Sequence, residues 1–168
     1  NIGYGIKENQ TISLYGRIDD HNTTGRNQTY KFNFTQILGQ FRFGATHSTG
    51  LRNPTLYELY GSDNFGIGGN TKLNPEKSET NELYLEYNFS ETMKFTSTGY
   101  RAKVFDRIET NSAYSMHENK LIDINQEGIE SGLLIDKNNQ RINFFTTFSK
   151  SRKANGQAQS RRPDLSYG

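Results

Sequence analysis

The sequence predicts an all-β fold: about eight consecutive, hairpin-linked strands that form one segment of a larger antiparallel transmembrane β-barrel. Three observations support this fold class. Apolar and polar residues alternate along most of the 168-residue chain, and short and long connections separate the alternating segments. The chain is also polar yet rich in aromatic residues, with 10 Tyr, 11 Phe and a mean hydropathy of −0.87. Strands with one face toward lipid and the other toward a watery lumen have this composition.

The strand signal is an apolar residue at every second position, which places the apolar side chains on one face of a strand. In the second clear segment, for example, Tyr30, Phe32 and Phe34 occupy alternate positions. Each segment with this period is therefore predicted to be a strand. The signal is clearest over residues 11–19, 29–36, 41–47, 82–89 and 141–149.

Residues 94–110 form a longer segment with a less regular pattern. Tyr100, Ala102 and Val104 share one parity, and the basic residues of the segment take the other. Asp106 interrupts the apolar set, so its apolar stretch is expected to end near Val104.

Residues 120–136 give the weakest strand signal. The parity of the apolar residues shifts between Ile124 and Ile129. A single inserted residue moves all following side chains to the other face of a strand, so the shift predicts a β-bulge near Asn125 or Gly128.

The connections between these segments alternate in length. The short ones lie at residues 8–9, 38–39, 91–93 and 137–139, and the long ones span residues 20–28, 49–79, 111–119 and the chain from 151 onward. Outer-membrane barrels have tight turns on the periplasmic side and long loops outside. A soluble β-sandwich has no such requirement, so the connections favour the barrel.

Charge follows the same two faces. In the five clearest strands the apolar parity carries no charged residue, and a Lys or Arg on a lipid face costs roughly 2–4 kcal/mol at mid-membrane. Alternation alone is equally compatible with a soluble sheet whose apolar face lies in a dry core, and the connection lengths favour the barrel. The charged residues of the opposite parity are Arg17, Lys31, Arg42, Glu82, Glu86 and Arg141.

Composition excludes several other classes of protein. The net charge is +2 with interspersed charges, so nucleic acid is not an expected partner. Without cysteine, the chain has no disulfides, no thiol nucleophile and few routes to a zinc site. No run approaches the ~18 apolar residues that a membrane-spanning helix needs.

The long connection at 49–79 carries the most specific pattern in the chain. It reads LRNPTLYELYG over residues 51–61, then GGN over 68–70 and TKLNPEKS over 71–78. This order closely resembles the signature of TonB-dependent receptors, with Leu51 in place of the usual aromatic residue and Asn53 in place of the usual small one. The positions in register are Arg52, Pro54, Leu56, Leu59, Tyr60, Gly61, Gly69, Asn70, Leu73, Pro75, Glu76, Ser78 and Glu82.

The resemblance continues from residue 11 to the C-terminus. Residues 100–108, 125–130 and 161–163 are similar to further strand elements of the family. It implies that residues 1–168 are a fragment of the receptor's β-barrel domain, without the plug domain and the C-terminal strands. It further implies location in the outer membrane of a Gram-negative bacterium, with outer-membrane lipid as a partner.

The resemblance also implies a function: ligand-gated import of a scarce nutrient chelate, energised by TonB acting through the missing plug. The cargo is expected to be cobalamin or a ferric siderophore, and the compact spacing of the motif favours cobalamin. The alternative is a passive outer-membrane pore or a surface adhesin with the same strand pattern. No enzymatic activity, catalytic residue or cofactor is expected.

Site residues follow from the same segment. The family-motif residues are interpreted as mainly structural, because Pro54 and Pro75 fix φ and the glycines permit turns. We expect Tyr57, Tyr60 and Phe65 to contact ligand, since aromatic side chains on an outer loop can hold a planar or amphipathic molecule. The three histidines show no metal-ligand spacing, so no metal site is expected.

Overall fold

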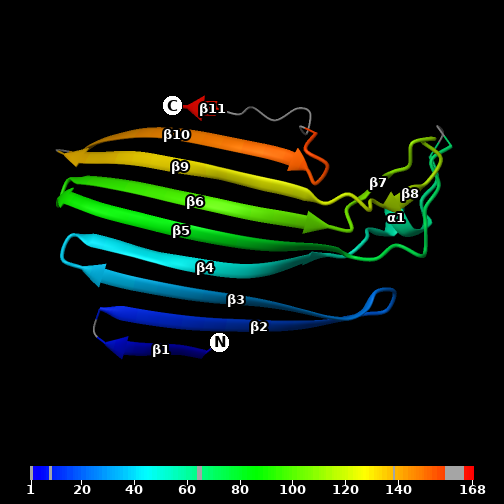
Figure 1. Cartoon of the computed structure of the whole chain (residues 1–168), viewed down its shortest axis with the longest axis horizontal. Helices are drawn as coiled ribbons and strands as arrows, with labels where there is room; N and C mark the ends of the chain where they lie inside the picture. Colours follow the sequence, from blue (N-terminus) through cyan, green and yellow to red (C-terminus); the bar gives the residue numbers. More distant parts are fainter. Residues whose placement is uncertain (1, 8, 64–65, 138, 158–164) are drawn as a thin grey trace.

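The computed structural model describes residues 2–7, 9–63, 66–137, 139–157 and 165–168. Its main element is one antiparallel sheet of nine strands, in the order β1-β2-β3-β4-β5-β6-β9-β10-β11 (Figure 1). The predicted all-β, hairpin-linked fold is thus confirmed. The strands are β1 (Ile2–Lys7), β2 (Gln10–His21), β3 (Gly25–Leu38), β4 (Phe41–Arg52), β5 (Glu76–Ser90), β6 (Met93–Phe105), β9 (Ile124–Lys137), β10 (Gln140–Lys153) and β11 (Leu165–Tyr167).

Three smaller elements lie in the connections at one end of this sheet. Helix α1 (Leu56–Tyr60) belongs to the β4–β5 connection, and the hairpin of β7 (Ile108–Thr110) and β8 (His117–Asn119) belongs to the β6–β9 connection. Figure 1 places all three beyond the right-hand end of the strands. Within the described residues, no helix is long and apolar enough to cross a bilayer.

The opposite end of the sheet carries the tight turns. Two residues, 39–40, connect β3 to β4, and two residues, 91–92, connect β5 to β6. Gly39 has φ +57° and Asn139, just before β10, has φ +61°. The common two-residue hairpin turns place residues at positive φ, which Gly and Asn adopt most readily. The turn at 91–92 is of another kind, since neither Glu91 nor Thr92 has a positive φ. The short connections predicted at 38–39 and 91–93 are thus confirmed, whereas Glu8 and Asn138 of the other two lie outside the described residues.

The long connection predicted at residues 20–28 is wrong. Strand β2 continues to His21 and β3 begins at Gly25, which leaves a turn of three residues. Asp19 pairs with Asn27 and Asp20 with Arg26, so polar residues carry the ladder beyond the apolar stretch. Strand pairing needs only backbone groups, and in water it tolerates side chains that a sequence pattern assigns to a loop.

The predicted bulge in residues 120–136 is also wrong. Strand β9 pairs with both β6 and β10 without a register shift. The parity changes for another reason. Ile124 lies on the polar face of the sheet, where its side chain is buried at the loop end and only 1% exposed, so an apolar residue is tolerated there without a bulge. The register shifts that do occur lie between Gly5 and Lys7 and between Asn88 and Ser90, next to tight turns.

The register divides the sheet into two faces, because residues directly opposite each other point to the same side. The face that we call apolar carries large side chains that stay exposed, such as Leu83, at 69%. The other face, called polar, carries the six charged residues predicted for it, and that prediction is confirmed. Exposed members of the apolar face include Leu14, Ile18, Tyr30, Phe32, Phe41, Phe43, Leu83, Leu85, Ile129, Ile142, Phe144 and Phe148.

On β6 the two parities are exchanged relative to the prediction. Tyr100 pairs with Glu82 on the polar face, and Ala102 and Val104 share that face. The apolar face of β6 instead carries Phe95, Ser97 and Gly99, followed by the two basic residues 101 and 103. The apolar stretch of β6 therefore ends at Gly99, because the strand leaves the apolar band there and continues into a polar zone.

Two tyrosines on the polar face lie across glycines of neighbouring strands. Tyr84 is paired with Gly44, and a Cβ on Gly44 would lie 2.6 Å from the Tyr84 hydroxyl and would also collide with the Phe34 carbonyl. Tyr100 covers Gly128 in the same way, with 2.8 Å between a Cβ and the tyrosine Cζ. An aromatic ring over a strand glycine shields the exposed backbone and pins the register.

Adding a methyl group under either ring should therefore destabilise the barrel. We expect Gly44→Ala or Gly128→Ala to lower the free energy of unfolding of the complete protein by about 1–3 kcal/mol through overpacking. Urea unfolding in detergent would measure it. Gly99→Ala is the matched control, because a Cβ there meets nothing within 4 Å. An equal loss in all three variants would contradict the role of the rings.

The sheet is open, which predicts the behaviour of the chain alone. Strands β1 and β11 each pair on one side only within the described residues, and lipid cannot satisfy an open edge. We expect the 168-residue chain in detergent to associate or remain protease-sensitive, as measured by size-exclusion chromatography with light scattering and limited proteolysis. A monodisperse, protease-resistant monomer would contradict this.

Candidate functional site

The loop end of the sheet is a small folded assembly. Gly68 of the β4–β5 connection forms a bridge with Met116 of the β6–β9 connection. The Gly68 amide donates to the Ser115 carbonyl at 2.8 Å, and the His117 amide donates to the Gly68 carbonyl at 3.2 Å. Two connections that are far apart in sequence are thereby held together at one end of the barrel wall.

Helix α1 begins with a capping box. Thr55 Oγ1 accepts a hydrogen bond from the Glu58 amide at 3.2 Å, and Glu58 Oε2 accepts one from the Thr55 amide at 2.7 Å. The pattern Thr-x-x-Glu satisfies two helix-start amides reciprocally. At the other end, the Gly61 amide donates to the Tyr57 carbonyl at 2.7 Å. A Cβ on Gly61 would collide with the Tyr57 ring, so the close approach requires glycine.

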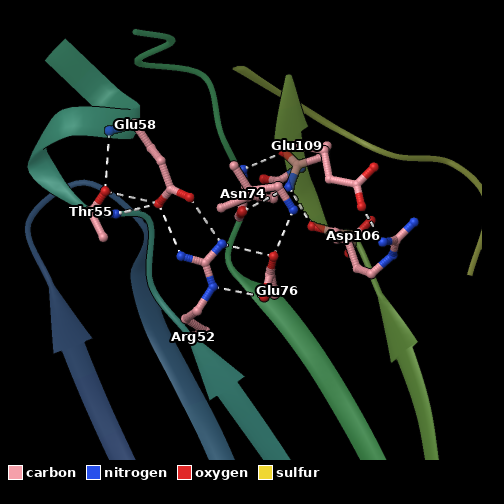
Figure 2. Close-up of polar contacts among 10 residues, drawn as sticks. Arg52, Thr55, Glu58, Asn74, Glu76, Asp106 and Glu109 are labelled. Carbon is pink, nitrogen blue, oxygen red and sulfur yellow. Dashed lines mark hydrogen bonds and ion pairs between the residues drawn. The ribbon is translucent and has the colours of Figure 1, made fainter. Parts of the chain in front are cut away.

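Arg52 joins the helix to the sheet (Figure 2). Its Nε and Nη2 donate to the two carboxylate oxygens of Glu76 at 2.7 and 2.8 Å. Its Nη1 and Nη2 donate to Glu58 at 3.0 and 3.1 Å. Glu76 Oε1 also accepts from the Ile108 amide at 2.7 Å. One guanidinium thus links the end of β4, the first turn of α1, the start of β5 and, through Glu76, β7.

Electrostatics favour the ionised state of this cluster. The hydrogen bond from Arg52 lowers the pKa of Glu76. Partial burial raises the pKa of Glu58, but hydrogen bonds from Arg52 and Thr55 outweigh it, so the net pKa is lowered. The hydrogen bonds to Glu76 and Glu58 raise the pKa of Arg52. All three groups lie at the loop end, outside the apolar band.

The second half of the motif closes the connection over a small core. The Asn70 amide donates to the Glu58 carbonyl and its side chain donates to the His117 carbonyl, at 2.8 and 2.9 Å. A Cβ on Gly69 would lie 2.6 Å from the Leu59 carbonyl, so glycine is needed there as well. The motif residues Leu59 and Leu73 are buried and pack in one hydrophobic cluster with Ile108 of β7.

Several of these partners are missed by sequence reasoning. Glu58 is absent from the predicted set, although the Thr-x-x-Glu spacing is a readable signal for it. The contacts of Ile108 with Glu76 and of Asn119 with Asn74 carry no local signal, because each joins residues more than thirty positions apart. Asn119 accepts from the Asn74 amide at 2.8 Å and donates to the Asn74 carbonyl at 3.0 Å.

Glu82 and the predicted ligand residues have different surroundings. Glu82 lies on the polar face opposite Thr46 and Tyr100, and within the described part of the chain its carboxylate forms no hydrogen bond or ion pair. Tyr57 and Tyr60 project from α1 and are 47% and 60% exposed. Phe65 lies outside the described residues.

Tyr57 is held in place while its ring stays accessible. Its hydroxyl donates to Asp63 Oδ2 at 3.1 Å, and its ring meets the His117 ring edge-on with centroids 5.7 Å apart. An aromatic side chain fixed in this way can bind a planar or amphipathic ligand at a low entropic cost. Contact of Tyr57, Tyr60 or Phe65 with a ligand stays a prediction.

The Arg52 cluster predicts how the loop assembly responds to mutation and pH. Arg52→Met should lower the local opening free energy of residues 53–75 by about 1 kcal/mol, because half-exposed charged hydrogen bonds contribute little more. Both carboxyl pKa values are lowered, so the stabilisation is present above the ordinary pKa of 4.5 and is lost as pH falls below it.

Hydrogen exchange of the complete protein, followed by mass spectrometry at pH 7 and pH 4, would measure this. The Asn70 and Ile108 amides should exchange faster in Arg52→Met at pH 7, and the difference from the wild type should shrink at low pH. Arg17→Met is the control, since Arg17 forms a local, exposed pair with Asp19. Unchanged protection at pH 7 would refute the role of Arg52.

Comparison with known proteins places this geometry in a family. The family described as TonB dependent receptor-like, beta-barrel, matches residues 3–158. The vitamin B12 transporter BtuB of Vibrio cholerae serotype O1 is 28% identical over 115 residues, which cover 68% of this chain and 18% of that protein. The chain therefore spans less than a fifth of the length of this curated relative.

Solved structures show the same fold. The siderophore receptor PirA from Acinetobacter baumannii superposes with a TM-score of 0.79 at 20% identity, covering 96% of this chain and 28% of that one. The copper transporter OprC gives a TM-score of 0.73 at 16% identity, covering 97% and 29%. The family match over most of the chain confirms the resemblance seen in the sequence motif. This chain belongs to the TonB-dependent receptor family, as part of its β-barrel.

Proposed function

We propose that the receptor containing this chain imports a scarce nutrient chelate across the outer membrane of a Gram-negative bacterium. In this proposal the apolar face contacts lipid, the polar face lines the lumen, and the loop assembly around α1 captures cargo from outside. The observation that carries the proposal is the Arg52 cluster, because it fixes an aromatic-bearing helix at the loop end of a barrel wall.

The two faces of the sheet support the membrane part of the proposal. Soluble proteins rarely expose large contiguous apolar surfaces, and here exposed Leu, Ile and Phe side chains cover one face across the main strands. The polar face carries Lys31, Arg42, Glu82 and Glu86 in the same strands. A wall between hydrocarbon and water needs both properties at once.

Inward release requires parts that other segments of the receptor would supply. We propose that a plug domain inside the barrel contacts TonB and that TonB energises release of the cargo. This chain covers only 18% of the V. cholerae relative, which supports the proposal that it is part of a larger protein. Residues 1–168 would contribute wall and outer loops to it.

For the cargo we propose cobalamin, with a ferric siderophore as the second choice. The V. cholerae relative is a vitamin B12 transporter, and the compact spacing of the motif in this chain is consistent with that cargo. Siderophore receptors share the fold at low identity, which carries no information on the ligand. Tyr57 and Tyr60 are the proposed contacts, with Phe65 as a third.

Calorimetric titration of the complete receptor in detergent, with cobalamin and a panel of ferric siderophores, would test cargo choice. We expect tight binding of cobalamin, weakened about tenfold or more by Tyr57→Ala or Tyr60→Ala, as for aromatic anchors in other interfaces. Tyr15→Ala is the control, because Tyr15 lies on β2 away from the loop end. Siderophore binding would change the cargo only, and no binding to any compound would favour a passive pore or an adhesin.

A further inference from the structure

The apolar face ends along one row of paired residues. This row crosses five strands and consists of Ala45, Leu83, Gly99, Ile129 and Phe148. The next row toward the loops is polar and consists of His47, Asn81, Arg101, Glu127 and Lys150. On these five strands the face changes from apolar to polar over two residues, whereas on β2 and β3 it stays apolar one row further, at Leu14 and Phe32. If this face contacts a membrane, the change on the five strands marks the boundary between hydrocarbon and the polar interface.

A hollow lies across this boundary on the same face, lined by residues of both rows, such as Leu83 on one side and Asn81 on the other. Its volume is about 770 Å³, within the range of roughly 300–1,000 Å³ of small-molecule sites. The small residues Ala45 and Gly99 leave space at its floor, and a Cβ on Gly99 would meet nothing within 4 Å. Phe32 and Phe148 also line it. The hollow is therefore an apolar depression suited to a flexible hydrocarbon chain.

The polar rim of the hollow has a positive balance. On β5, β6, β9 and β10 the two rows beyond the boundary carry four basic and two acidic side chains. The Lys150 ammonium lies 5.2 Å from the centre of the Phe148 ring, so its stem runs back along the apolar wall. The set is Arg101, Lys103, Lys150, Arg152, Glu79 and Glu127.

Arg101 is the basic residue best placed to meet an anion at this rim. It is exposed, it lies two positions from Gly99 on the same face, and it also lines the hollow. Within the described part of the chain, no carboxylate lies within ion-pair distance of it. Lys103, in contrast, is paired with Asp123 at 3.0 Å. Glu127 lies between Arg101 and Lys150, so the rim keeps one net positive charge there.

We propose that this hollow binds an anionic, phosphate-bearing lipid, with an acyl chain against Gly99 and Ala45 and the phosphate at Arg101 and Lys150. The inference rests on the proposed function, because the apolar face must contact a membrane. Charge complementarity selects the occupant: an apolar hollow with a basic rim at the hydrocarbon boundary matches a lipid whose anionic group lies directly above its chains.

Native mass spectrometry of the complete receptor, in detergent with phosphatidylglycerol or phosphatidylcholine of equal chain length, would test the site. We expect more retained phosphatidylglycerol than phosphatidylcholine. The double variant Arg101→Gln/Lys150→Gln should weaken phosphatidylglycerol binding about tenfold, as two interfacial charges contribute. Arg42→Gln/Lys31→Gln is the matched control, since both residues lie on the polar face.

A second pair of variants tests the hollow itself. Gly99→Leu should fill it and reduce retention of both lipids, whereas Gly16→Leu, on the same face with equally open surroundings, should not. Equal retention of the two lipids by the wild type, or equal effects of a variant and its control, would overturn the site. A receptor that binds cargo in the outer membrane but shows no lipid preference would refute the lipid site alone, whereas absence from the outer-membrane fraction would refute both proposals.

Discussion

The continuous antiparallel ladder is the constraint on which the rest of the structure depends. A chain that faces hydrocarbon on one side must satisfy its backbone groups within the sheet, because lipid offers no hydrogen-bonding partner. Strands β2 to β6, β9 and β10 meet this requirement through pairing on both sides, with tight turns that return the chain at once. Because the backbone hydrogen bonds are made within the sheet, one face can carry apolar side chains and the other polar ones.

Side chains then fix the strand register and the conformation of the connections, which backbone pairing alone does not determine. On the polar face, Tyr84 over Gly44 and Tyr100 over Gly128 resist a slip in register, because a slip would bring a Cβ under the ring. Where the pairing of β4 with β5 ends, at Arg52 and Glu76, the Arg52 cluster holds the chain together (Figure 2). Its charges stabilise one another because each carboxylate accepts hydrogen bonds from a shared cation.

The loop assembly and the boundary on the apolar face serve different parts of the proposed function, namely capture of the cargo and contact with the membrane. The first presents a rigid, aromatic helix to the outside, where preorganisation lowers the entropic cost of capturing a dilute cargo. The boundary on the apolar face would fix the depth of the wall in the lipid. Gly99 and Arg101 lie two residues apart on one strand, and the first faces an apolar environment while the second needs a polar one. Both depend on β6 and β5 continuing past the apolar band as paired, water-exposed strands.

The sequence alone determined most strands, the two faces and the family motif. Alternation of period two gives the strands and faces, and the spacing of Gly, Pro and Asn gives the motif, because both are visible within a few residues. Tertiary structure decided what depends on distant partners. The face of Tyr100, the unbroken register of β9 and the three-residue turn before Gly25 follow from pairing, which acts through backbone groups of any residue type. The contacts of Arg52 with Glu58 and Glu76, and of Leu59 with Ile108, likewise exist only once connections far apart in sequence meet at one end of the sheet.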